Sequence, residues 1–340
     1  MDTSIWDSQI KNINSGKGYQ EVWYLTMMDP KSLRALTLRF SILSSHNGFR
    51  KIAETWAIYF ERTKEKEMVK SAVKQTFDIR EFSSTPTDGG AIIKIANSFV
   101  SPTETRGKIQ SKGQGVSWDL KIDQSGAFRF NAVPELLQNH PKLFQHTTLK
   151  SYEALKFSGT SEIGGEKQEW KDVPGVLTHS AGTRSGESWV WAHCNTFVNE
   201  QNQPVPFVFE GWEGKRKLGP LLSPRVSSLY FVYQNQEYKF KSLWDNFKSR
   251  SKSSLTEWEF QVEKDDLLFK GSAKSELKDF AGLTYEDTDG SLVYCAHSKL
   301  SDITITVYRR GKLECTLKSA GTAALEFADR KKNPYVALLV

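Results

Sequence analysis

The stretch SWVWAHCNTF, residues 188–197, carries the clearest structural pattern in this chain of 340 residues. Successive side chains of a β-strand point to opposite faces of its sheet. A strand here would place four large or polar side chains on one face: Trp189, Trp191, His193 and Asn195. The residues between them are smaller, which is typical of a face that packs against other protein. The aromatic face either fills the core of a β-barrel or forms the wall of a pocket.

Strand-like runs rich in aromatic or β-branched residues recur along most of the chain. They include EVWYLTMM (21–28), LRALTLRFSIL (33–43), ETWAIYFER (54–62), VSWDLKID (116–123), SLYFVYQ (228–234), SLVYCAHS (291–298) and DITITVYRR (302–310). Turn signals separate them, such as DGG at 88–90 and TDG at 288–290. Many short strands at this spacing are typical of barrels and sandwiches, so the sequence predicts an all-β fold.

Two pairs of short segments recur at nearly the same offset. ETW at 54–56 is matched by ESW at 187–189, and SWDLKI at 117–122 is matched by EWEFQV at 257–262. Because the two offsets are similar, the matches favour two β-domains with their strands in similar order.

The boundary between these domains is expected in the stretch 158–175. It is rich in Gly, Ser and charged residues and lacks an apolar period, as linkers do. We therefore predict two antiparallel β-barrel domains packed together, an N-terminal one at 1–160 and a C-terminal one at 176–340.

The charge of the chain is mixed. The formal net charge is +6, but 46 basic residues stand against 40 acidic ones. Basic residues gather in three short runs among loop-forming residues, at 215–217, 248–252 and 330–332. They do not alternate with aromatic residues along a strand, so we interpret them as solvated loop charge and expect no nucleic-acid partner.

Features of targeting and redox state point to the cytoplasm. The first residues are polar and acidic and lack the apolar run of a secretory signal. No stretch has the ~20 apolar residues that span a bilayer, so we expect no stable membrane insertion. The odd number of cysteines, three, is most simply explained by free thiols, although pairing of Cys295 with Cys315 stays open. The sequence does not indicate the oligomeric state.

Common signatures of cofactor and metal chemistry are missing. The sequence contains no phosphate-binding loop, no dinucleotide-binding GxGxxG, no HExxH and no paired CxxC. Its six histidines lack the spacing of a metal site. We therefore expect neither a cofactor nor a metal.

The aromatic face of 188–197 remains the best candidate for chemistry. Indole faces suit a hydrocarbon or a developing cation, because the face of the ring is negative. His193 and Asn195 would then orient a polar group or move a proton; otherwise His193 simply bonds a backbone carbonyl.

Three carboxylates accompany this face as candidates. Glu210 follows an apolar run in FVFEGWEG, where burial would raise its pKa and make it a general acid; otherwise it pairs with a lysine. Glu326 lies between alanines and is either a buried acid or a partner of Arg330. Glu21 shares a face with Trp23, an unusual environment for a carboxylate.

Several of these motifs resemble one known group of proteins. EVWYLTMMDPKSLRALTLRFSIL, ESWVWAHCNTF and the closing YEDTDGSLVYCAHS and GTAALEFADR resemble the tocopherol cyclase-like and carotenoid 1,2-hydratase (AttH-like) group. The resemblance touches both halves of the chain, and W-x-W-x-H is its most specific element. It implies two lipocalin-like β-barrels of the calycin superfamily.

The resemblance also implies a hydrophobic cavity for isoprenoid or polyene-like substrates. Chemistry in this group includes acid-promoted water addition, ring closure of isoprenoid chains and pericyclic cyclisation. By this resemblance the four residues of the aromatic face line the pocket, and the accessory positions are Glu21, Trp23, Glu210, Glu326 and Tyr294. The group often carries export or plastid signals, which this chain lacks, and no motif here holds a pair of acids.

Three functions follow as hypotheses. The first is a cofactor-independent cyclase, hydratase or isomerase of secondary metabolism, acting on a lipophilic molecule in a barrel cavity. His193 would be its proton donor or orienting group, with Glu210 or Glu326 as the acid. The second is a protein that binds or carries a lipophile without changing it. The third is a scaffold with a filled core.

Overall fold

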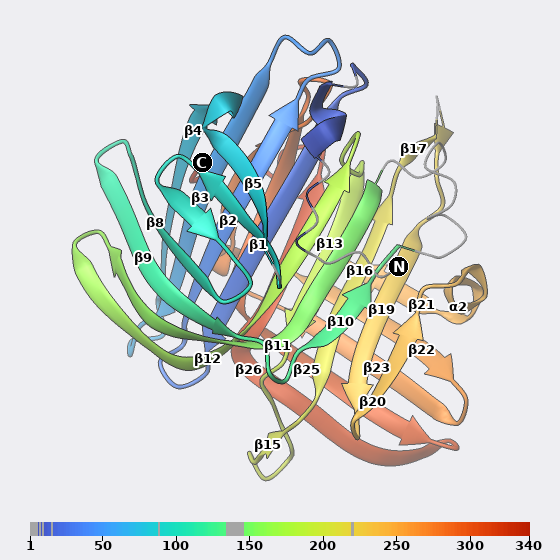
Figure 1. Cartoon of the computed structure of the whole chain (residues 1–340). Coiled ribbons are helices and arrows are strands. Elements are labelled where there is room, and N and C mark those ends of the chain that lie inside the picture. Colours follow the sequence, from blue (N-terminus) through green and yellow to red (C-terminus); the bar gives the residue numbers. More distant parts are fainter. Residues whose placement is uncertain are drawn as a thin grey trace.

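The computed structural model describes residues 6, 8, 10–14, 16–87, 89–133, 146–218 and 221–340. Its strands form two large antiparallel sheets that lie side by side (Figure 1). The strands of the first sheet are β1 (Tyr19–Asp29), β2 (Arg34–Ser44), β3 (Lys51–Arg62), β4 (Met68–Asp78), β5 (Phe82–Thr87), β6 (Gly90–Ile95), β7 (Ser98–Val100), β8 (Glu104–Ser111), β9 (Gln114–Asp123), β10 (Phe128–Asn131), β11 (His146–Ile163) and β12 (Glu166–Gly182).

The second sheet contains the remaining long strands. Its members are β13 (Ser188–Cys194), β14 (Phe197–Val198), β15 (Pro204–Val205), β16 (Val208–Lys215), β19 (Val226–Tyr233), β20 (Gln236–Phe240), β21 (Arg250–Ser253), β22 (Glu257–Lys264), β23 (Leu267–Lys274), β24 (Ala281–Glu286), β25 (Leu292–Arg309) and β26 (Lys312–Asp329). The strands β17 (Lys217–Leu218) and β18 (Leu221–Leu222) form a separate hairpin. The short helices are η1 (Ile10–Asn14), η2 (Ile79–Glu81), α2 (Leu243–Lys248) and η3 (Leu277–Asp279).

The two sheets follow the same strand order. The first runs β4-β3-β2-β1-β12-β11-β9-β8, and the second runs β20-β19-β16-β13-β26-β25-β23-β22. In both, a long hairpin, β11–β12 or β25–β26, lies beside the first strand of the sheet. The all-β fold that the sequence predicts is confirmed.

The short repeats in the sequence do not correspond to this internal similarity. ETW at 54–56 lies in β3, whereas ESW at 187–189 leads into β13, which occupies the place of β1. SWDLKI lies in β9, whereas EWEFQV lies in β22, which occupies the place of β8. Strands rich in tryptophan resemble one another because they share a pleated, half-buried environment. The similar order is therefore a property of the topology and not of these matches.

The stretch 158–175, expected as a linker, is part of the first sheet. It forms the β11–β12 hairpin, whose turn contains Gly164 and Gly165, both at positive φ. Buried Ile163 and Trp170 flank the turn, and Trp170 Nε1 donates to Ser161 Oγ over 2.9 Å. The glycines and charges therefore mark a hairpin turn. We propose that the two units meet at 183–187, between β12 and β13.

Each sheet curls around its own apolar core (Figure 1). The alternation of β1 shows how the sequence builds two buried surfaces. Trp23 and Leu25 face the first core, whereas Met28 packs into a third cluster, which residues of both sheets share. That third cluster includes Phe60 of the first sheet and Leu283 of the second. The sheets are therefore joined by an apolar interface of their own.

Two further observations concern the cysteines and the helices. Cys194, Cys295 and Cys315 are all free thiols, as the simplest interpretation of the sequence predicted. Within the described parts of the chain, no helix has the length and apolar character required to traverse a bilayer.

Candidate functional site

Strand β13 places the aromatic row between the two sheets. Val190 and Ala192 face the core of the second sheet. Trp191 therefore faces the other way and packs into the cluster that both sheets share. The alternation predicted from the sequence is present, but its aromatic face is turned away from its own barrel. The cavity that Trp189 and Trp191 line therefore lies between the sheets and not inside the barrel, because the small side chains of β13 are those that fit the phenylalanine-rich core.

That cavity has a volume of about 170 Å3. Its walls carry three tryptophans, two tyrosines, two arginines and one carboxylate: Trp189, Trp191, Trp212, Tyr24, Tyr285, Arg39, Arg216 and Glu326. A cavity of roughly 150 Å3 holds a molecule the size of benzene. The space therefore accepts a small molecule or the reacting end of a longer one, against walls that are mainly aromatic.

Glu326 is the carboxylate of this cavity and lies at the centre of a buried cluster. Its Oε1 accepts hydrogen bonds from Tyr24 Oη at 2.8 Å and from Lys299 Nζ at 2.9 Å. His297 Nδ1 lies 3.6 Å from the same oxygen. Burial alone would raise the pKa of Glu326, but Lys299, His297 and the hydrogen bonds lower it to about 2. Glu326 is therefore an ionised carboxylate at neutral pH, and its partner is Lys299 rather than the predicted Arg330.

Lys299 brings a positive charge beneath the aromatic wall. Its side chain is fully buried, and its Nζ lies 4.6 Å from the centre of the Trp191 ring and 4.9 Å from that of Tyr24. Ammonium groups are attracted to the faces of such rings. Burial lowers the pKa of Lys299, while Glu326 opposes that shift. Lys299 thereby fixes the positions of the ring, the phenol and the carboxylate together.

A second buried cluster lies behind Trp191. Glu210 Oε1 accepts a hydrogen bond from Trp191 Nε1 at 3.0 Å, and its Oε2 accepts one from Ser151 Oγ at 2.5 Å. His193 Nε2 lies 2.6 Å from Glu153 Oε2. The cluster joins β13 and β16 of the second sheet to β11 of the first. It contains the pair of acids that no single motif of the sequence shows.

Burial controls protonation in this cluster. It raises the pKa of Glu153 to about 7 and, together with the charge of Glu153, raises that of Glu210 to about 8. Burial lowers the pKa of His193 to about 4. The short contact between His193 and Glu153 is therefore a hydrogen bond between a neutral imidazole and a carboxyl group, and not an ion pair. At neutral pH the two acids together retain at least one proton.

A β-bulge aims Glu153 at His193. The register of β11 with β12 shifts between Tyr152 and Leu155, and Ala154 adopts a φ of 60°. Because of this extra residue, Tyr152 and Leu155 both face the first core. Glu153 then points to the second sheet. Bulges re-aim side chains in this way, and a regular period-two interpretation of the sequence does not reveal them.

The acid pair predicts a pH dependence of stability. Because the pKa values of Glu153 and Glu210 are raised in the folded state, both groups stabilise the folded protein below about pH 4.5. This stabilisation is lost as the pH rises through about 7 for Glu153 and about 8 for Glu210. His193, whose pKa is lowered, makes the free energy of unfolding rise with pH, but only between about pH 4 and 6.5. We therefore expect the free energy of unfolding to fall by on the order of 1–2 kcal/mol between pH 6.5 and 8.

Urea unfolding across this pH range measures the fall. Glu210→Gln should flatten it, because the amide stays neutral while its oxygen still accepts from Trp191. Glu259→Gln, at an exposed position of the same sheet, is the control and should leave the slope unchanged. An equally steep fall in the Glu210→Gln protein would contradict the assignment.

The other predicted site residues lie away from the cavity between the sheets. Asn195 follows the end of β13, and its Nδ2 donates to the backbone oxygen of Gly175 in β12 at 3.0 Å. Glu21 lies inside the first barrel, where it accepts from Tyr19 Oη at 2.7 Å and contacts His179 Nε2 at 2.8 Å. Trp23 stacks on His179 in the same place. The row predicted from the sequence therefore ends at His193.

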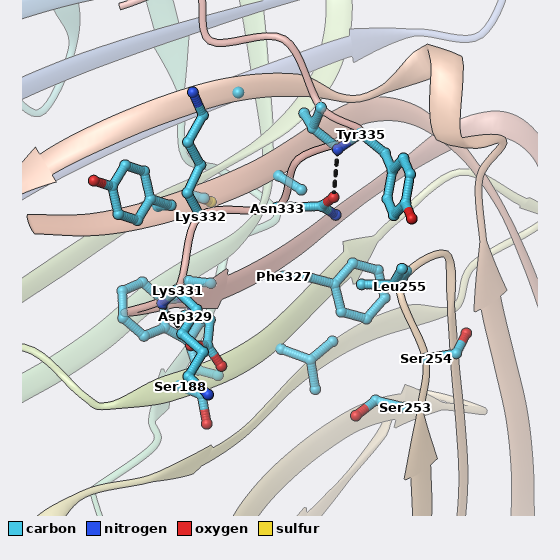
Figure 2. Close-up of a pocket in the computed structure, with 18 of the residues that line it drawn as sticks. Ser188, Ser253, Ser254, Leu255, Phe327, Asp329, Lys331, Lys332, Asn333 and Tyr335 are labelled. Carbon is cyan, nitrogen blue, oxygen red and sulfur yellow. Dashed lines mark hydrogen bonds between the residues drawn. The ribbon is translucent and has the colours of Figure 1, made fainter.

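Tyr294 lines a different cavity, of about 360 Å3, at one end of the second sheet. Figure 2 shows this cavity, with Phe327 among its apolar walls. In β25 the neighbouring Cys295 faces the shared cluster, so Tyr294 faces the opposite side. It does not reach the cavity that contains Glu326.

Sequence reasoning missed five residues of the two clusters: Tyr24, His297, Lys299, Ser151 and Glu153. Tyr24 follows Trp23 in a strand with apolar residues on both faces, so no sequence pattern indicated that Tyr24 belongs to a site. A lysine two positions after His297, in the run YCAHSKL, was a usable signal, because charged side chains are rarely buried without a partner. Glu153 could not be assigned to this face from the sequence, because the bulge at Ala154 interrupts the regular alternation of β11.

Comparisons with known proteins give matches of structure alone. No protein-family model and no curated protein sequence matches the chain. A protein of Nitrosomonas europaea described as an AttH superposes with a TM-score of 0.48 at 11% identity, covering 92% of each chain. Kievitone hydratase from Nectria haematococca gives 0.47 at 11% identity, covering 91% of this chain and 88% of its own.

A third structure, CghA with Sch210972, gives a TM-score of 0.55 at 8% identity. It covers 93% of this chain and 90% of its own. At this similarity the two chains share a fold. CghA belongs to the AttH-like group. The chain therefore has the fold of the AttH-like group, as the resemblance of its motifs predicted.

Proposed function

We propose that this chain is a cofactor-independent enzyme of the hydratase or cyclase type, and that its substrate is a lipophilic small molecule bound between the two sheets. One observation carries the proposal: three tryptophans and an ionised, lysine-paired carboxylate line the same cavity. A filled core would leave no space beside this ion pair, whereas here the cavity reaches the carboxylate itself.

The aromatic walls suit the hydrocarbon part of the substrate. Water addition and ring closure of isoprenoid chains, which the resemblance implies, pass through positive charge on carbon. The indole faces of Trp189 and Trp191 would stabilise that charge, and so would the fixed carboxylate of Glu326. These groups are held in place before the substrate arrives, so little reorganisation is needed in the transition state.

The polar end of the substrate would meet Tyr24. Its hydroxyl lines the cavity and is held 2.8 Å from Glu326 Oε1. Because Tyr24 Oη donates its single hydrogen to Glu326, we assign Tyr24 the role of a hydrogen-bond acceptor for a substrate hydroxyl or water, and Glu326 that of the charge-stabilising group. His193 and Glu210 lie behind Trp191 and act as positioning residues in this proposal.

The two arginines of the cavity favour a substrate with an electron-rich polar group. The Arg216 guanidinium lies 5.4 Å from the Trp212 ring, and the Arg39 guanidinium lies 5.0 Å from that of Tyr285. Burial lowers the pKa of Arg216 only to about 10, so it keeps its charge at neutral pH. A carboxylate, phenolate or enolate at one end of a lipophilic molecule would suit this wall.

The first test is native mass spectrometry of the freshly purified protein, followed by extraction with organic solvent. We expect a stoichiometric lipophile, or uptake of one from a varied isoprenoid and polyene library. Trp191→Ala should reduce its retention at least about tenfold, since a tryptophan wall contributes several kcal/mol. Phe49→Ala is the control, because that side chain is 91% exposed on a loop.

Turnover is tested with the ligand so identified. Incubation in heavy-oxygen water followed by mass spectrometry detects water addition, and chromatography at unchanged mass detects ring closure. A ligand that is bound in the cavity and recovered unchanged under all conditions would identify a carrier and overturn the proposal of catalysis. Absence of any retained lipophile from the library would overturn the lipophilic substrate class.

A further inference from the structure

The three basic runs of the sequence meet at one end of the second sheet. Ser188 pairs with Lys215 on one side and with Asp329 on the other, so the ends of β16 and β26 lie next to each other. Arg225 Nη1 donates to Ser253 Oγ at 3.0 Å, which brings in β21. Runs that are separate in the sequence therefore form one surface, which we call the basic end.

A cavity opens at the basic end. It is the second cavity described above, of about 360 Å3, and its rim includes Lys331, Lys332, Tyr335, Leu255, Ser253 and Arg225. Figure 2 shows Lys331, Lys332 and Tyr335 approaching it from the C-terminal segment, with Ser253 and Leu255 across from them. Trp189 lines both this cavity and the one that contains Glu326. The two cavities are therefore neighbours.

Large apolar side chains are exposed around the same end. Trp244 is 78% exposed and Phe247 83% exposed on α2, which is anchored to β19 through Asn246 and Ser227. Figure 1 shows α2 beside β21, with β17 farther along the same edge. Seven of the twelve exposed large hydrophobic residues in the described part of the chain lie on β18, on α2 or around this cavity: Leu221, Leu222, Trp244, Phe247, Leu255, Tyr335 and Leu338.

The charges at the basic end are unbalanced. Seven basic side chains of the three runs form no ion pair with any described residue: Lys215, Lys217, Lys248, Arg250, Lys252, Lys331 and Lys332. Glu259 lies opposite Lys252 in the pairing of β21 with β22 and is exposed, whereas three other neighbouring acids are engaged locally. Glu213 is paired with Arg225 at 2.6 Å, Asp245 forms the capping box of α2, and Asp329 accepts from the backbone nitrogen of Lys331. The surface therefore presents positive charge around exposed aromatic rings.

We propose that the basic end docks on a bilayer containing anionic phospholipids. Tryptophan, phenylalanine and leucine side chains insert at the boundary between headgroups and acyl chains, while lysine and arginine bind the headgroups. Both features occur together at the basic end. Docking would place the cavity of the basic end at the source of a lipophile. The inference does not depend on the proposed catalysis, because the surface lies outside the catalytic groups.

Co-sedimentation of the full chain with vesicles tests the proposal. Vesicles of phosphatidylcholine with roughly one third phosphatidylserine should bind the protein, and pure phosphatidylcholine should bind it at least about tenfold more weakly. Binding should fall as salt rises, since salt screens exposed charges. The double variant Lys331→Glu/Lys332→Glu should bind the anionic vesicles at least about 25-fold more weakly, because each lysine near such a surface strengthens binding about fivefold.

A second variant separates the apolar contribution. Trp244→Ala/Phe247→Ala should lower binding by about tenfold or more and remove a blue shift of tryptophan fluorescence on vesicle addition. Both side chains are mostly exposed, so the variant should unfold at the same urea concentration as the parent. The matched control is Lys64→Glu/Lys112→Glu, at exposed turns of the first sheet, which should bind normally.

Two results would overturn the proposal. One is a protein that stays in the supernatant with anionic vesicles at low salt, in which case the surface serves a protein partner or a second copy of the chain. The other is vesicle binding that the two variants of the basic end leave unchanged.

Discussion

Glu326→Gln is expected to lower the free energy of unfolding by about 3–5 kcal/mol. The change removes the carboxylate that neutralises Lys299, whose side chain is fully buried. An ammonium group in such a place has lost its water and keeps only the attraction of two aromatic rings. The destabilisation should be greatest below neutral pH. There Lys299 stays protonated, so the folded state must bury an unpaired ammonium group. Urea unfolding followed by tryptophan fluorescence measures it.

A second substitution tests whether the lost partner is the cause. Lys299→Met combined with Glu326→Gln removes both charges at similar volume, and such replacements are often neutral or stabilising. The double variant should therefore recover most of the stability that Glu326→Gln loses. Tyr59 and Glu61 form a hydrogen-bonded pair elsewhere in the first sheet, and Glu61→Gln is the control, with a loss of no more than about 1 kcal/mol. A double variant as unstable as the single one would show that the pairing of Glu326 with Lys299 is not what holds this region together.

Tyr24→Phe is expected to lower kcat by about 10²–10³ on the substrate identified by extraction, with a much smaller change in KM. The substitution removes one hydroxyl from the cavity and leaves the ring over Lys299 in place. A preorganised hydroxyl dipole is most effective where charge develops in the transition state, so its loss affects the chemical step more than binding. Steady-state kinetics with separate kcat and KM values provide the measurement.

The matched control for Tyr24→Phe is Tyr59→Phe. Tyr59 is buried and, like Tyr24, donates to a carboxylate, here Glu61 Oε2 at 2.9 Å, but it lies outside the cavity. Both variants lose the same atom, so a difference in kcat between them reports on the site rather than on stability. If Tyr24→Phe retains full kcat, Tyr24 is not a catalytic residue and the proposed role passes to the carboxylate alone.

The sequence contained enough to predict the strands and their faces. The period-two alternation in SWVWAHC is a local property, because successive side chains of any strand point to opposite sides. For the same reason Glu21 shares a face with Trp23 and Leu25, as expected. The resemblance of several motifs was sufficient to predict the fold of the AttH-like group, which the structure comparison confirms.

The composition of the site depended on contacts between distant parts of the chain. Tyr24 and Glu326 are 302 residues apart and share a hydrogen bond. Trp191 belongs to an interface between sheets, and the sequence of β13 could not specify which of its faces would meet the other sheet. Local periodicity defines that a strand has two faces, whereas the packing partner of each face is decided by the assembly of the whole chain.

The same distinction explains Glu153 and the basic end. Regular alternation would place Glu153 on the same face as Leu155. Because of the extra residue at Ala154, Leu155 faces the first core and Glu153 faces away from it, and the period-two pattern of the sequence does not contain that information. The three basic runs look like isolated solvated loops until β16, β21 and β26 end at one place. The sequence by itself determined the strands and their alternation, because these follow from the geometry of neighbouring residues. Only the tertiary structure decided which faces meet and which charges gather, because those depend on contacts between strands that are far apart in the chain.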